Sequence, residues 1–219
     1  MTRVVVLGAT GRAGSAVLTQ LPPEVQATAA LRKPDDLSRL PVSDGSVTGV
    51  VVDIDDTESL RRATAEADVV VNAVRLRGDI DPMALVDLHE RVTEATRSSA
   101  NASVLVVTIG GAGALMMPDG TRFWQHPSFP EVTLPRGRAH ARLRAHLEAR
   151  EDGPPWAYLI PPPAFVPEGP RTGNHSMWPP AADESDFRGR SISYTDFADA
   201  VCTVVEGRLT GVRLVAASY

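Results

Sequence analysis

The stretch from Val4 to Leu21 constrains the fold more than any other part of this chain. Branched apolar residues lead into a glycine-rich turn, Gly8–Gly14, and apolar residues at helical spacing follow. In such a strand–turn–helix unit, Gly8 permits the tight turn, Gly11 allows a pyrophosphate to approach the backbone, and Gly14 allows the helix to pack closely on its strand. The start of the helix presents N–H groups to an anion. An ordinary glycine-rich turn is the alternative, but the flanking strand and helix favour a dinucleotide site.

Length and composition are those of an ordinary globular protein. The chain has 219 residues, of which 43% are hydrophobic and 22% charged, and a formal net charge of -5 at pH 7. We therefore expect a single domain over residues 1–219, with neither nucleic acid nor a membrane as partner. We see no leader pattern and no apolar run near the ~20 residues that cross a bilayer, so we expect a cytoplasmic protein. The single cysteine, Cys202, lies in an apolar helical pattern and is expected to be a buried structural thiol.

Strand and helix patterns alternate along the chain. Asp56 or Thr57 is a candidate N-cap for one helix, Pro82 is expected in the first turn of another, and a third is expected to be capped near Thr195. The right-handed crossover rule then predicts an α/β fold, a Rossmann-type doubly wound parallel sheet with a loop-rich C-terminal segment covering the cleft. Strands are expected at residues 4–7, 25–31, 47–52, 69–74, 103–109, 156–160, 191–193 and 212–217, and C-terminal helices at 134–150 and 194–206.

Ligands of doubly wound sheets bind beyond the carboxyl ends of the strands, and this rule selects the candidate cofactor residues. These residues come from the glycine turn and from the ends of the next four strands. They are Gly8, Thr10, Gly11, Arg12, Ala13, Gly14, Arg32, Asp53, Ile54, Ala73, Val74, Thr108 and Gly110.

The end of the second strand bears on the choice between NAD(H) and NADP(H). An acidic residue there binds the free 2′-hydroxyl of NAD, whereas a basic residue accommodates the 2′-phosphate of NADP. Arg32 and Lys33 stand at this point, with Arg12 in the glycine turn as a third cation. NADP(H) is therefore favoured, the alternative being that Arg32 and Lys33 are solvated turn residues.

Two irregular segments, 110–131 and 161–190, are expected to form substrate-site loops, because long loops in compact domains are commonly functional. Their large side chains either offer a flat apolar surface to a planar ring or form the loops' own small core. These side chains are Met116, Met117, Phe123, Trp124 and Trp178. No spacing among the five histidines resembles a metal site.

Several motifs taken together resemble the NmrA-like, NAD(P)H-binding group of atypical short-chain dehydrogenase/reductases. The similarity is strongest to the NADH-flavin reductases of this group and more distant to the biliverdin-IXβ/flavin reductases. It implies a Rossmann-type fold that binds NADP(H), with the substrate between the loop after the fifth strand and the C-terminal segment. The motifs are GATGRAG at 8–14, VVDIDD at 51–56, VVTIGGAGAL at 106–115, RAHARL at 138–143, WAYLIPPPAFVPEGPRTG at 156–173 and ISYTDFADA at 192–200.

The chain departs from short-chain dehydrogenases at the catalytic helix. These enzymes usually carry a tyrosine there and a lysine four residues on, whereas this helix has Arg136 and His140. His140 is the best titratable candidate for catalysis, and the alternative is a packed histidine. Arg75, with Arg77 beside it, follows the fourth strand and is a candidate clamp for an acidic acceptor, unless both arginines point to solvent.

Without a tyrosine proton donor, carbonyl reduction is poorly supported. The leading hypothesis is an NADPH-dependent reductase that transfers a hydride to a flavin, a quinone or a related planar and anionic small molecule. The alternatives are an NADP(H)-sensing regulator without turnover, and an isomerase, epimerase or cyclase of small-molecule biosynthesis. We expect a monomer or a homodimer.

Overall fold

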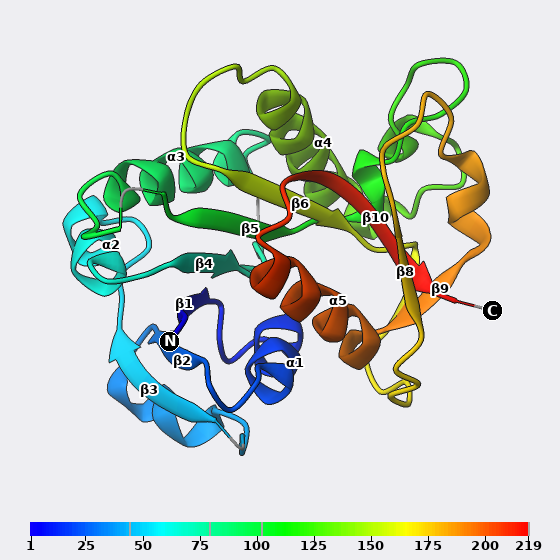
Figure 1. The fold of residues 1–219 in the computed structure, drawn as a ribbon. Helices are drawn as coiled ribbons and strands as arrows, with labels where there is room; N and C mark the ends of the chain where they lie inside the picture. Colours follow the sequence, from blue (N-terminus) through cyan, green and yellow to red (C-terminus); the bar gives the residue numbers. More distant parts are fainter. Residues whose placement is uncertain (44, 79, 102, 219) are drawn as a thin grey trace.

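The computed structural model describes residues 1–43, 45–78, 80–101 and 103–218, and within them an eight-stranded sheet forms the centre of the molecule (Figure 1). The strand order is β3-β2-β1-β4-β5-β6-β10-β8, and every neighbouring pair is parallel except β10 and β8. The order reverses between β1 and β4, which is the switch point of a doubly wound sheet. The strands are β1 (Arg3–Leu7), β2 (Gln26–Leu31), β3 (Ser46–Val51), β4 (Val69–Asn72), β5 (Leu105–Ile109), β6 (Trp156–Ile160), β8 (His175–Trp178) and β10 (Gly211–Ala217).

Five α-helices cover the two faces of this sheet in the described residues, so the predicted Rossmann-type α/β class is confirmed. They are α1 (Arg12–Gln20), α2 (Thr57–Thr64), α3 (Ala84–Thr96), α4 (Leu134–Glu148) and α5 (Tyr194–Gly207). Short 3-10 turns connect other elements: η1 (Pro34–Arg39), η2 (Ala112–Ala114), η3 (Phe123–Gln125), η4 (Glu131–Thr133) and η5 (Ser185–Gly189). Among the described helices, none has the length and apolar character needed to cross a membrane.

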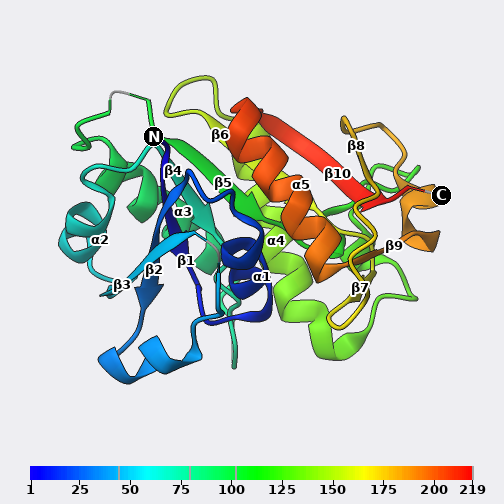
Figure 2. The ribbon, with the colours of Figure 1, turned by 60° about the horizontal axis from the view of Figure 1, so that its bottom comes forward.

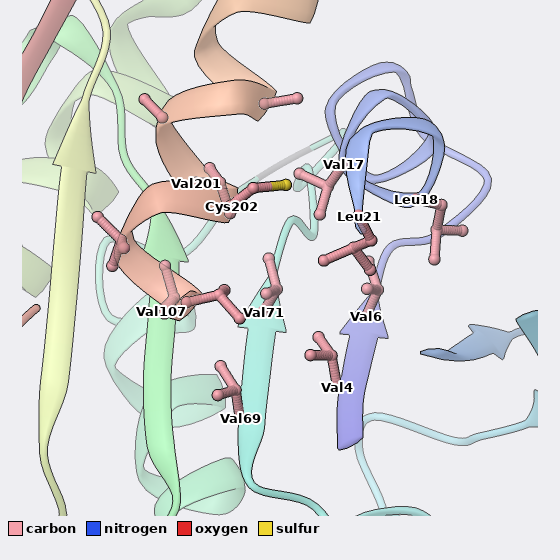
Figure 3. Packing of buried hydrophobic residues seen from close by; sticks show 14 of the residues in the cluster. Val4, Val6, Val17, Leu18, Leu21, Val69, Val71, Val107, Val201 and Cys202 are labelled. Carbon is pink, nitrogen blue, oxygen red and sulfur yellow. The ribbon is translucent and has the colours of Figure 1, made fainter. Parts of the chain in front are cut away.

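Helices α1 and α5 pack side by side on one face of the sheet (Figures 1 and 2). Figure 3 shows Val17 of α1 and Leu21, the residue that follows α1, facing Val201 and Cys202 of α5 above the valines of β1, β4 and β5. Cys202 is buried here, as expected, and burial raises the pKa of its thiol to about 12. A thiol with so high a pKa is a structural residue rather than a nucleophile.

Helices α2, α3 and α4 cover the opposite face. Leu60 of α2 and Leu88 of α3 pack on β1, β4 and β5, while Leu143 and Leu147 of α4 pack towards Tyr158 of β6. Strands buried on both faces explain the near-continuous apolar runs of the sequence.

Most predicted boundaries differ from the observed ones by one or two residues, and at three of them a side chain hydrogen-bonds to nearby backbone. Strand β4 ends at Asn72 rather than Val74, since the Asn72 side chain accepts a hydrogen bond from the Val74 N–H (3.1 Å). Helix α3 begins at Ala84, beyond Pro82, after a turn in which the Asp81 carboxylate accepts the Met83 N–H (2.7 Å). In α5 the cap is Ser193, whose hydroxyl accepts the Asp196 N–H (3.0 Å), rather than Thr195. The predicted Asp56 cap of α2 is confirmed by its bond from the Glu58 N–H (3.0 Å).

The segment 161–190 is more regular than its proline content indicated. Strand β8 extends the main sheet as its antiparallel edge, and β7 (Ala164–Val166) pairs in parallel with β9 (Ser191–Ser193) in a separate two-stranded sheet. These strands have only three or four residues, too few for a period-2 pattern to be recognised. The segment therefore reaches the carboxyl end of the sheet as a structured arm rather than as an open loop.

Candidate functional site

The glycine turn between β1 and α1 has the backbone geometry expected for a dinucleotide cradle. Gly8 has a φ of +74°, and a Cβ at this position would lie 2.6 Å from the Ala73 carbonyl oxygen. A Cβ on Gly14 would lie 2.3 Å from the Gly8 carbonyl oxygen, and the Gly11 N–H donates to that same oxygen (2.9 Å). Larger residues at Gly8 or Gly14 would therefore push the helix away from the strand.

The first turn of α1 leaves its N–H groups available to a ligand. Its N-cap is Gly11, which has no side chain to accept from them, and the turn contains no acidic residue. The N–H groups of Arg12, Ala13 and Gly14 lie at the positive end of the helix, next to the Thr10 backbone. These residues fit the pyrophosphate of a dinucleotide.

The edge formed by the ends of β2 and β3 carries exposed charge. Arg12 and Arg32 are both exposed, and neither forms an ion pair with any described residue. Asp53 is also exposed, but its carboxylate accepts the Asp55 N–H (2.9 Å), which closes a turn after β3.

A further residue at this edge escaped the sequence analysis. Arg91 of α3 donates from Nε to the Ile54 carbonyl (3.0 Å) and from Nη2 to the Asp55 carboxylate (3.0 Å). It ties the turn after β3 to α3 through Ile54 and Asp55. The position of Arg91 within its helical pattern gave no sign of this contact, because the turn that it binds lies 36 or 37 residues earlier in the sequence.

The ends of β4 and β5 bring two buried polar side chains together. Asn72 and Thr108 are in register on adjacent strands, and each is 2% exposed. Asn72 Nδ2 and Thr108 Oγ1 have no hydrogen-bond partner among the described residues. The Thr108 side chain is therefore buried at the end of its strand. The backbones of Ala73 and Gly110 continue the sheet just beyond the strand ends, because the Ala73 N–H donates to the Leu7 carbonyl (3.0 Å) and the Gly110 N–H donates to the Leu159 carbonyl (2.7 Å). Asn72 was recognisable as the one polar residue of an apolar strand, VVVN.

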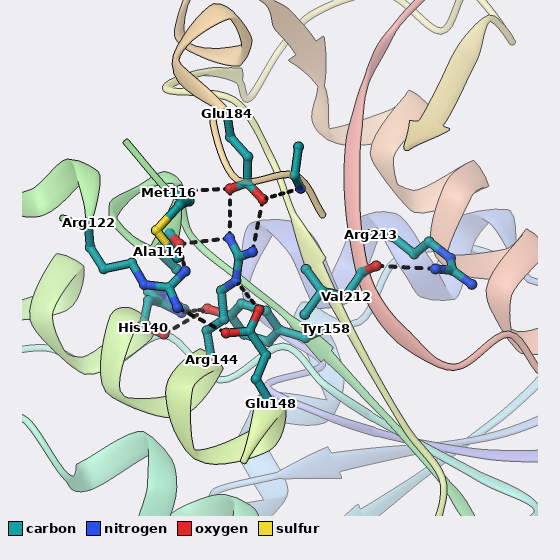
Figure 4. A network of polar contacts seen from close by, with 11 residues as sticks. Ala114, Met116, Arg122, His140, Arg144, Glu148, Tyr158, Glu184, Val212 and Arg213 are labelled. Atoms are coloured by element: carbon teal, nitrogen blue, oxygen red, sulfur yellow. Dashed lines mark hydrogen bonds and ion pairs between the residues drawn. The ribbon is translucent and has the colours of Figure 1, made fainter. Parts of the chain in front are cut away.

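His140 lies in α4 beside the loop that follows β5, held by Tyr158 of β6. Its Nδ1 is 2.9 Å from the Tyr158 hydroxyl, which also donates to the His140 carbonyl oxygen (3.2 Å) (Figure 4). Gly111 packs against the ring so closely that a Cβ there would lie 2.6 Å from His140 Cδ2. The imidazole is half-buried, and no described residue hydrogen-bonds to its Nε2. This nitrogen is the one left for a ligand.

The environment of His140 favours its neutral form. Burial, and to a smaller degree the positive charge of Arg136, lower the pKa of His140 to about 4. Burial also raises the pKa of Tyr158, so its hydroxyl keeps its proton. Tyr158 lies in the strand expected at 156–160, and its bond to His140 could not be predicted, because only the fold brings the two residues together.

Arg136 lies within electrostatic range of Arg75, which follows β4, and of Tyr194 at the start of α5. Burial, followed by the charge of Arg75, lowers the pKa of Arg136, whereas Tyr194 raises it. Arg75 is exposed, and Arg136 and Tyr194 are half-buried. The structure thus brings the predicted Arg75 near the first turn of α4. Figure 2 shows the starts of α1, α4 and α5 gathered at the carboxyl end of the sheet.

A buried ion-pair network holds the C-terminal arm against α4 (Figure 4). Arg144 donates to both oxygens of Glu184 (2.7 and 2.8 Å), and each side chain is 1% exposed. Glu184 also accepts the Met116 N–H (2.8 Å), and Glu148 accepts from Arg144 (2.8 Å) and Arg122 (2.9 Å). This network fixes the arm and the loop after β5 relative to α4, and sequence spacing gave no sign of it.

The large loop side chains belong mainly to the protein core. Met117 and Phe123 are 3% and 4% exposed and pack in the cluster under α4. Trp178 packs on Phe187 with a ring-centroid distance of 6.0 Å. For Met117, Phe123 and Trp178 the structure supports the loops' own core, whereas Met116 and Trp124 are half-buried.

A reversal of strand order, a glycine cradle and an uncapped helix start define a Rossmann-type dinucleotide-binding protein. The model of the NAD(P)H-binding family matches residues 8–207, and the chain belongs to this family. The predicted family and the expectation of a nicotinamide dinucleotide cofactor are thereby confirmed.

Similar proteins cover nearly the whole chain. The uncharacterized protein YwnB of Bacillus subtilis (strain 168) is 25% identical over 207 residues, which are 93% of this chain and 92% of YwnB. Among solved structures, a protein of Streptococcus pneumoniae TIGR4 described as a "putative NADH-flavin reductase" is 23% identical, with full coverage of both chains and a TM-score of 0.77. A "putative epimerase" from Bacteroides thetaiotaomicron is 21% identical, covers 100% of this chain and 98% of its own, and has a TM-score of 0.81. At these identities the solved structures establish the shared fold.

Proposed function

We propose that this protein is an NADPH-dependent reductase that transfers a hydride to a flavin, a quinone or a related planar acceptor. The glycine cradle and the start of α1 would hold the pyrophosphate, and exposed Arg12 and Arg32 would accept the 2′-phosphate. The nicotinamide, when bound, supplies the hydride. The Streptococcus pneumoniae protein described as a flavin reductase supports the same class of acceptor.

The observation that carries the choice of acceptor is the state of His140. Helix α4 contains neither tyrosine nor lysine, and the one histidine at the lysine-equivalent position has a pKa of about 4. A neutral imidazole is a poor acid for protonating an alkoxide formed from a carbonyl. Flavins and quinones do not need such an acid, because their reduced anions take a proton from water.

His140 then has a positioning role in this proposal. Tyr158 fixes its Nδ1, so Nε2 is oriented towards the end of the cleft and can bind a hydroxyl group of the cofactor or of the acceptor. Orientation and electrostatics, rather than proton transfer, are the main contributions that the chain's own residues make to the rate.

A steady-state assay tests the proposal. NADPH oxidation is followed at 340 nm with FMN, FAD and a set of quinones, and NADH is run in parallel. We expect turnover that saturates with at least one of these acceptors. Tight NADPH binding, measured by nicotinamide fluorescence, without turnover on any acceptor would contradict the reductase and favour the cofactor-sensing regulator.

A second candidate, an epimerase or isomerase on the same fold, is favoured by the Bacteroides thetaiotaomicron neighbour. An enzyme of that class regenerates its cofactor within each cycle and shows no net NADPH oxidation. The same assay therefore separates it from the reductase.

A further inference from the structure

A cavity between two segments far apart in the sequence has no lining residue in common with the candidate cofactor site. Its volume is about 460 Å³, within the range of small-molecule pockets. One wall is the loop after β5 and the other is η5, so the cavity lies between the two predicted substrate-site loops, 110–131 and 161–190. Figure 1 shows these segments, in green and orange, on the same side of the molecule. The polar lining residues are Asp119, Thr121, Gln125, His126, Ser185 and Arg188.

The tautomer of His126 follows from its contacts with Ser128. The Ser128 backbone N–H donates to His126 Nδ1 (3.1 Å), and the Ser128 hydroxyl lies 2.8 Å from the same nitrogen. Because a backbone N–H can only donate, Nδ1 accepts this bond and carries no proton. The ring proton is therefore on Nε2, so this nitrogen is a hydrogen-bond donor.

Arg188 brings a second donor to the same point. Its Nη1 lies 3.4 Å from His126 Nε2, and a guanidinium N–H can only donate. The two donors therefore face each other with no described acceptor between them. The guanidinium is held in this place because its Nε donates to the Ser185 carbonyl (3.2 Å) and its Cζ lies over the Phe123 ring, 5.5 Å from the centroid.

The described residues leave the charge of Arg188 without a partner. No described carboxylate lies within 4.0 Å of its guanidinium, whereas Arg144, which also contacts the C-terminal arm, is paired with Glu184. Arg188 and His126 are both half-buried. Two donors that converge at such a position, one of them charged, are satisfied when an oxyanion accepts from both.

A carboxylate elsewhere in the lining restricts the ligand further. Asp119 Oδ1 accepts from the backbone N–H and the hydroxyl of Thr121 (3.0 and 2.6 Å). The carboxylate repels a second negative charge and attracts a hydroxyl or an ammonium group. A ligand that suits both parts of the lining therefore combines an oxyanion with at least one hydroxyl or ammonium group.

We propose that Arg188 and His126 bind the oxyanion of a small polar molecule in this cavity, with its hydroxyl or ammonium group towards Asp119. The ligand class is a carboxylate or a phosphate ester, since both present more than one oxygen to the paired donors. The inference is independent of the proposed function, because no lining residue belongs to the candidate cofactor site. It assigns a second small-molecule site to this chain.

The first measurement determines the tautomer of His126. Long-range proton–nitrogen NMR correlation distinguishes a protonated ring nitrogen from an unprotonated one, and comparison with His126→Gln identifies the His126 signals. We expect the proton on Nε2 in the protein without ligand. A proton on Nδ1 would make Nε2 an acceptor for Arg188, which would pair the two side chains and overturn the inference.

The second measurement is the binding of matched probes to the protein saturated with NADP+, so that the dinucleotide site is filled. Glycerol 3-phosphate and glycerate carry an oxyanion and hydroxyl groups, whereas glycerol has hydroxyl groups alone. Calorimetry should show saturable binding of at least one anionic probe and about tenfold weaker binding of glycerol, as charge-assisted hydrogen bonds predict. The His126 NMR signals should shift along the same saturation curve.

Variants connect this binding to the two donors. Arg188→Ala is expected to weaken the anionic probe about tenfold, and His126→Gln should weaken it less, because a glutamine amide can still donate. Arg190→Ala is the matched control, because Arg190 is also half-buried and lies over a ring, that of Trp178 (4.6 Å), but does not line the cavity. It should leave the affinity unchanged. Arg188→Lys, which keeps the charge and loses the planar fork, should give an intermediate affinity and serves as the test if Arg188→Ala does not fold.

The outcomes are distinct from those of the turnover assay. The inference is overturned if neither anionic probe binds, if glycerol binds as tightly, or if Arg188→Ala and Arg188→Lys both keep the wild-type affinity. Each of these results leaves the reductase proposal to its own assay, which contains none of these probes. Conversely, Arg188-dependent binding in a protein that never oxidises NADPH would support this site while refuting the reductase.

Discussion

The imidazole Nδ1 of His140 lies 2.9 Å from the hydroxyl of Tyr158, so a residue of α4 and a residue of β6 form one polar unit at the end of the sheet. The bond fixes the ring and leaves Nε2 for a ligand, while burial lowers the pKa of His140 to about 4. Around neutral pH this histidine is therefore an uncharged hydrogen-bonding group. The first prediction concerns what that group does.

His140→Ala is expected to lower kcat about tenfold while the KM for NADPH changes less than threefold, since the residue positions the reacting groups rather than holding the cofactor. Tyr158→Phe, which leaves the imidazole but releases its Nδ1, should reproduce part of this loss. Steady-state kinetics with the best acceptor provide the measurement. A fall in melting temperature with unchanged kcat in both variants would instead identify His140 as a packing residue.

The second prediction concerns stability in mild acid. Burial lowers the pKa of His89 from 6.5 to about 4, against an opposing effect of Glu90. Between these two pH values the unfolded chain binds a proton that the folded chain excludes, so the free energy of unfolding falls as the pH falls. The shift corresponds to a loss on the order of 3 kcal/mol by pH 4.

His89→Leu removes this titration, because leucine has no ionisable group. An apolar side chain suits the position, since His89 is 2% exposed and its Nδ1 has no described partner. Urea unfolding between pH 7 and pH 4 gives the free energy of unfolding as a function of pH. In His89→Leu this free energy should depend less steeply on pH than in the wild type, and the difference in slope should correspond to at most one proton taken up on unfolding. Parallel curves for the two proteins would show that His89 is not the group responsible.

The sequence was sufficient to predict the Rossmann-type sheet and the strand–turn–helix unit around Gly8–Gly14. Strand β1, the glycine turn and α1 are contiguous, so the geometry of Gly8 and Gly14 follows from local rules. The acceptor end was less predictable. Arg136 and Tyr194 are 58 positions apart by their numbers in the chain, and they come within electrostatic range of each other only because α4 and α5 begin at the same end of the sheet.

The buried polar contacts were the least predictable part. Arg144 and Glu184 are polar residues in an arginine-rich helix and a proline-rich segment, where solvated side chains are the usual expectation. Similarly, Tyr158 stands in a strand whose burial alone accounts for an aromatic residue. Long-range pairing of this kind leaves no periodic signal in a single sequence.

Gly14→Ala tests the cradle itself. The added Cβ would lie 2.3 Å from the Gly8 carbonyl oxygen, a backbone atom that cannot move without shifting the turn. We expect a loss of about 2 kcal/mol in the free energy of unfolding and a weakening of NADPH binding by more than tenfold. Gly189→Ala is the control, because a Cβ at that position would have no other atom within 4 Å. Unchanged NADPH affinity in Gly14→Ala would place the dinucleotide elsewhere.

Arg32→Ala tests the preference for the phosphorylated cofactor. If exposed Arg32 accepts the 2′-phosphate, its removal should weaken NADPH about tenfold and leave NADH within twofold. Lys33→Ala, at the neighbouring position, measures whether the effect is specific to Arg32. Fluorescence titration with both cofactors gives the affinities, and an equal loss for NADPH and NADH would remove Arg32 from the phosphate site.

The final prediction concerns the ion pair that attaches the C-terminal arm. Glu184→Gln leaves the Arg144 guanidinium, 1% exposed, without its buried counter-charge, which typically costs about 3–5 kcal/mol. The same change weakens the bonds from the Met116 and Ala181 N–H groups (2.8 and 3.2 Å), so the arm should detach before the rest of the fold opens. Limited proteolysis should then cut within residues 167–183 faster in Glu184→Gln than in the wild type, and urea unfolding should give the loss in stability.

Glu206→Gln, an exposed change on α5, is the control and should alter neither measurement. If the arm also closes the acceptor site, the KM for the acceptor will rise in Glu184→Gln while the KM for NADPH stays constant. Equal proteolysis rates in the variant and the wild type would show that the arm is held by its strand pairing alone.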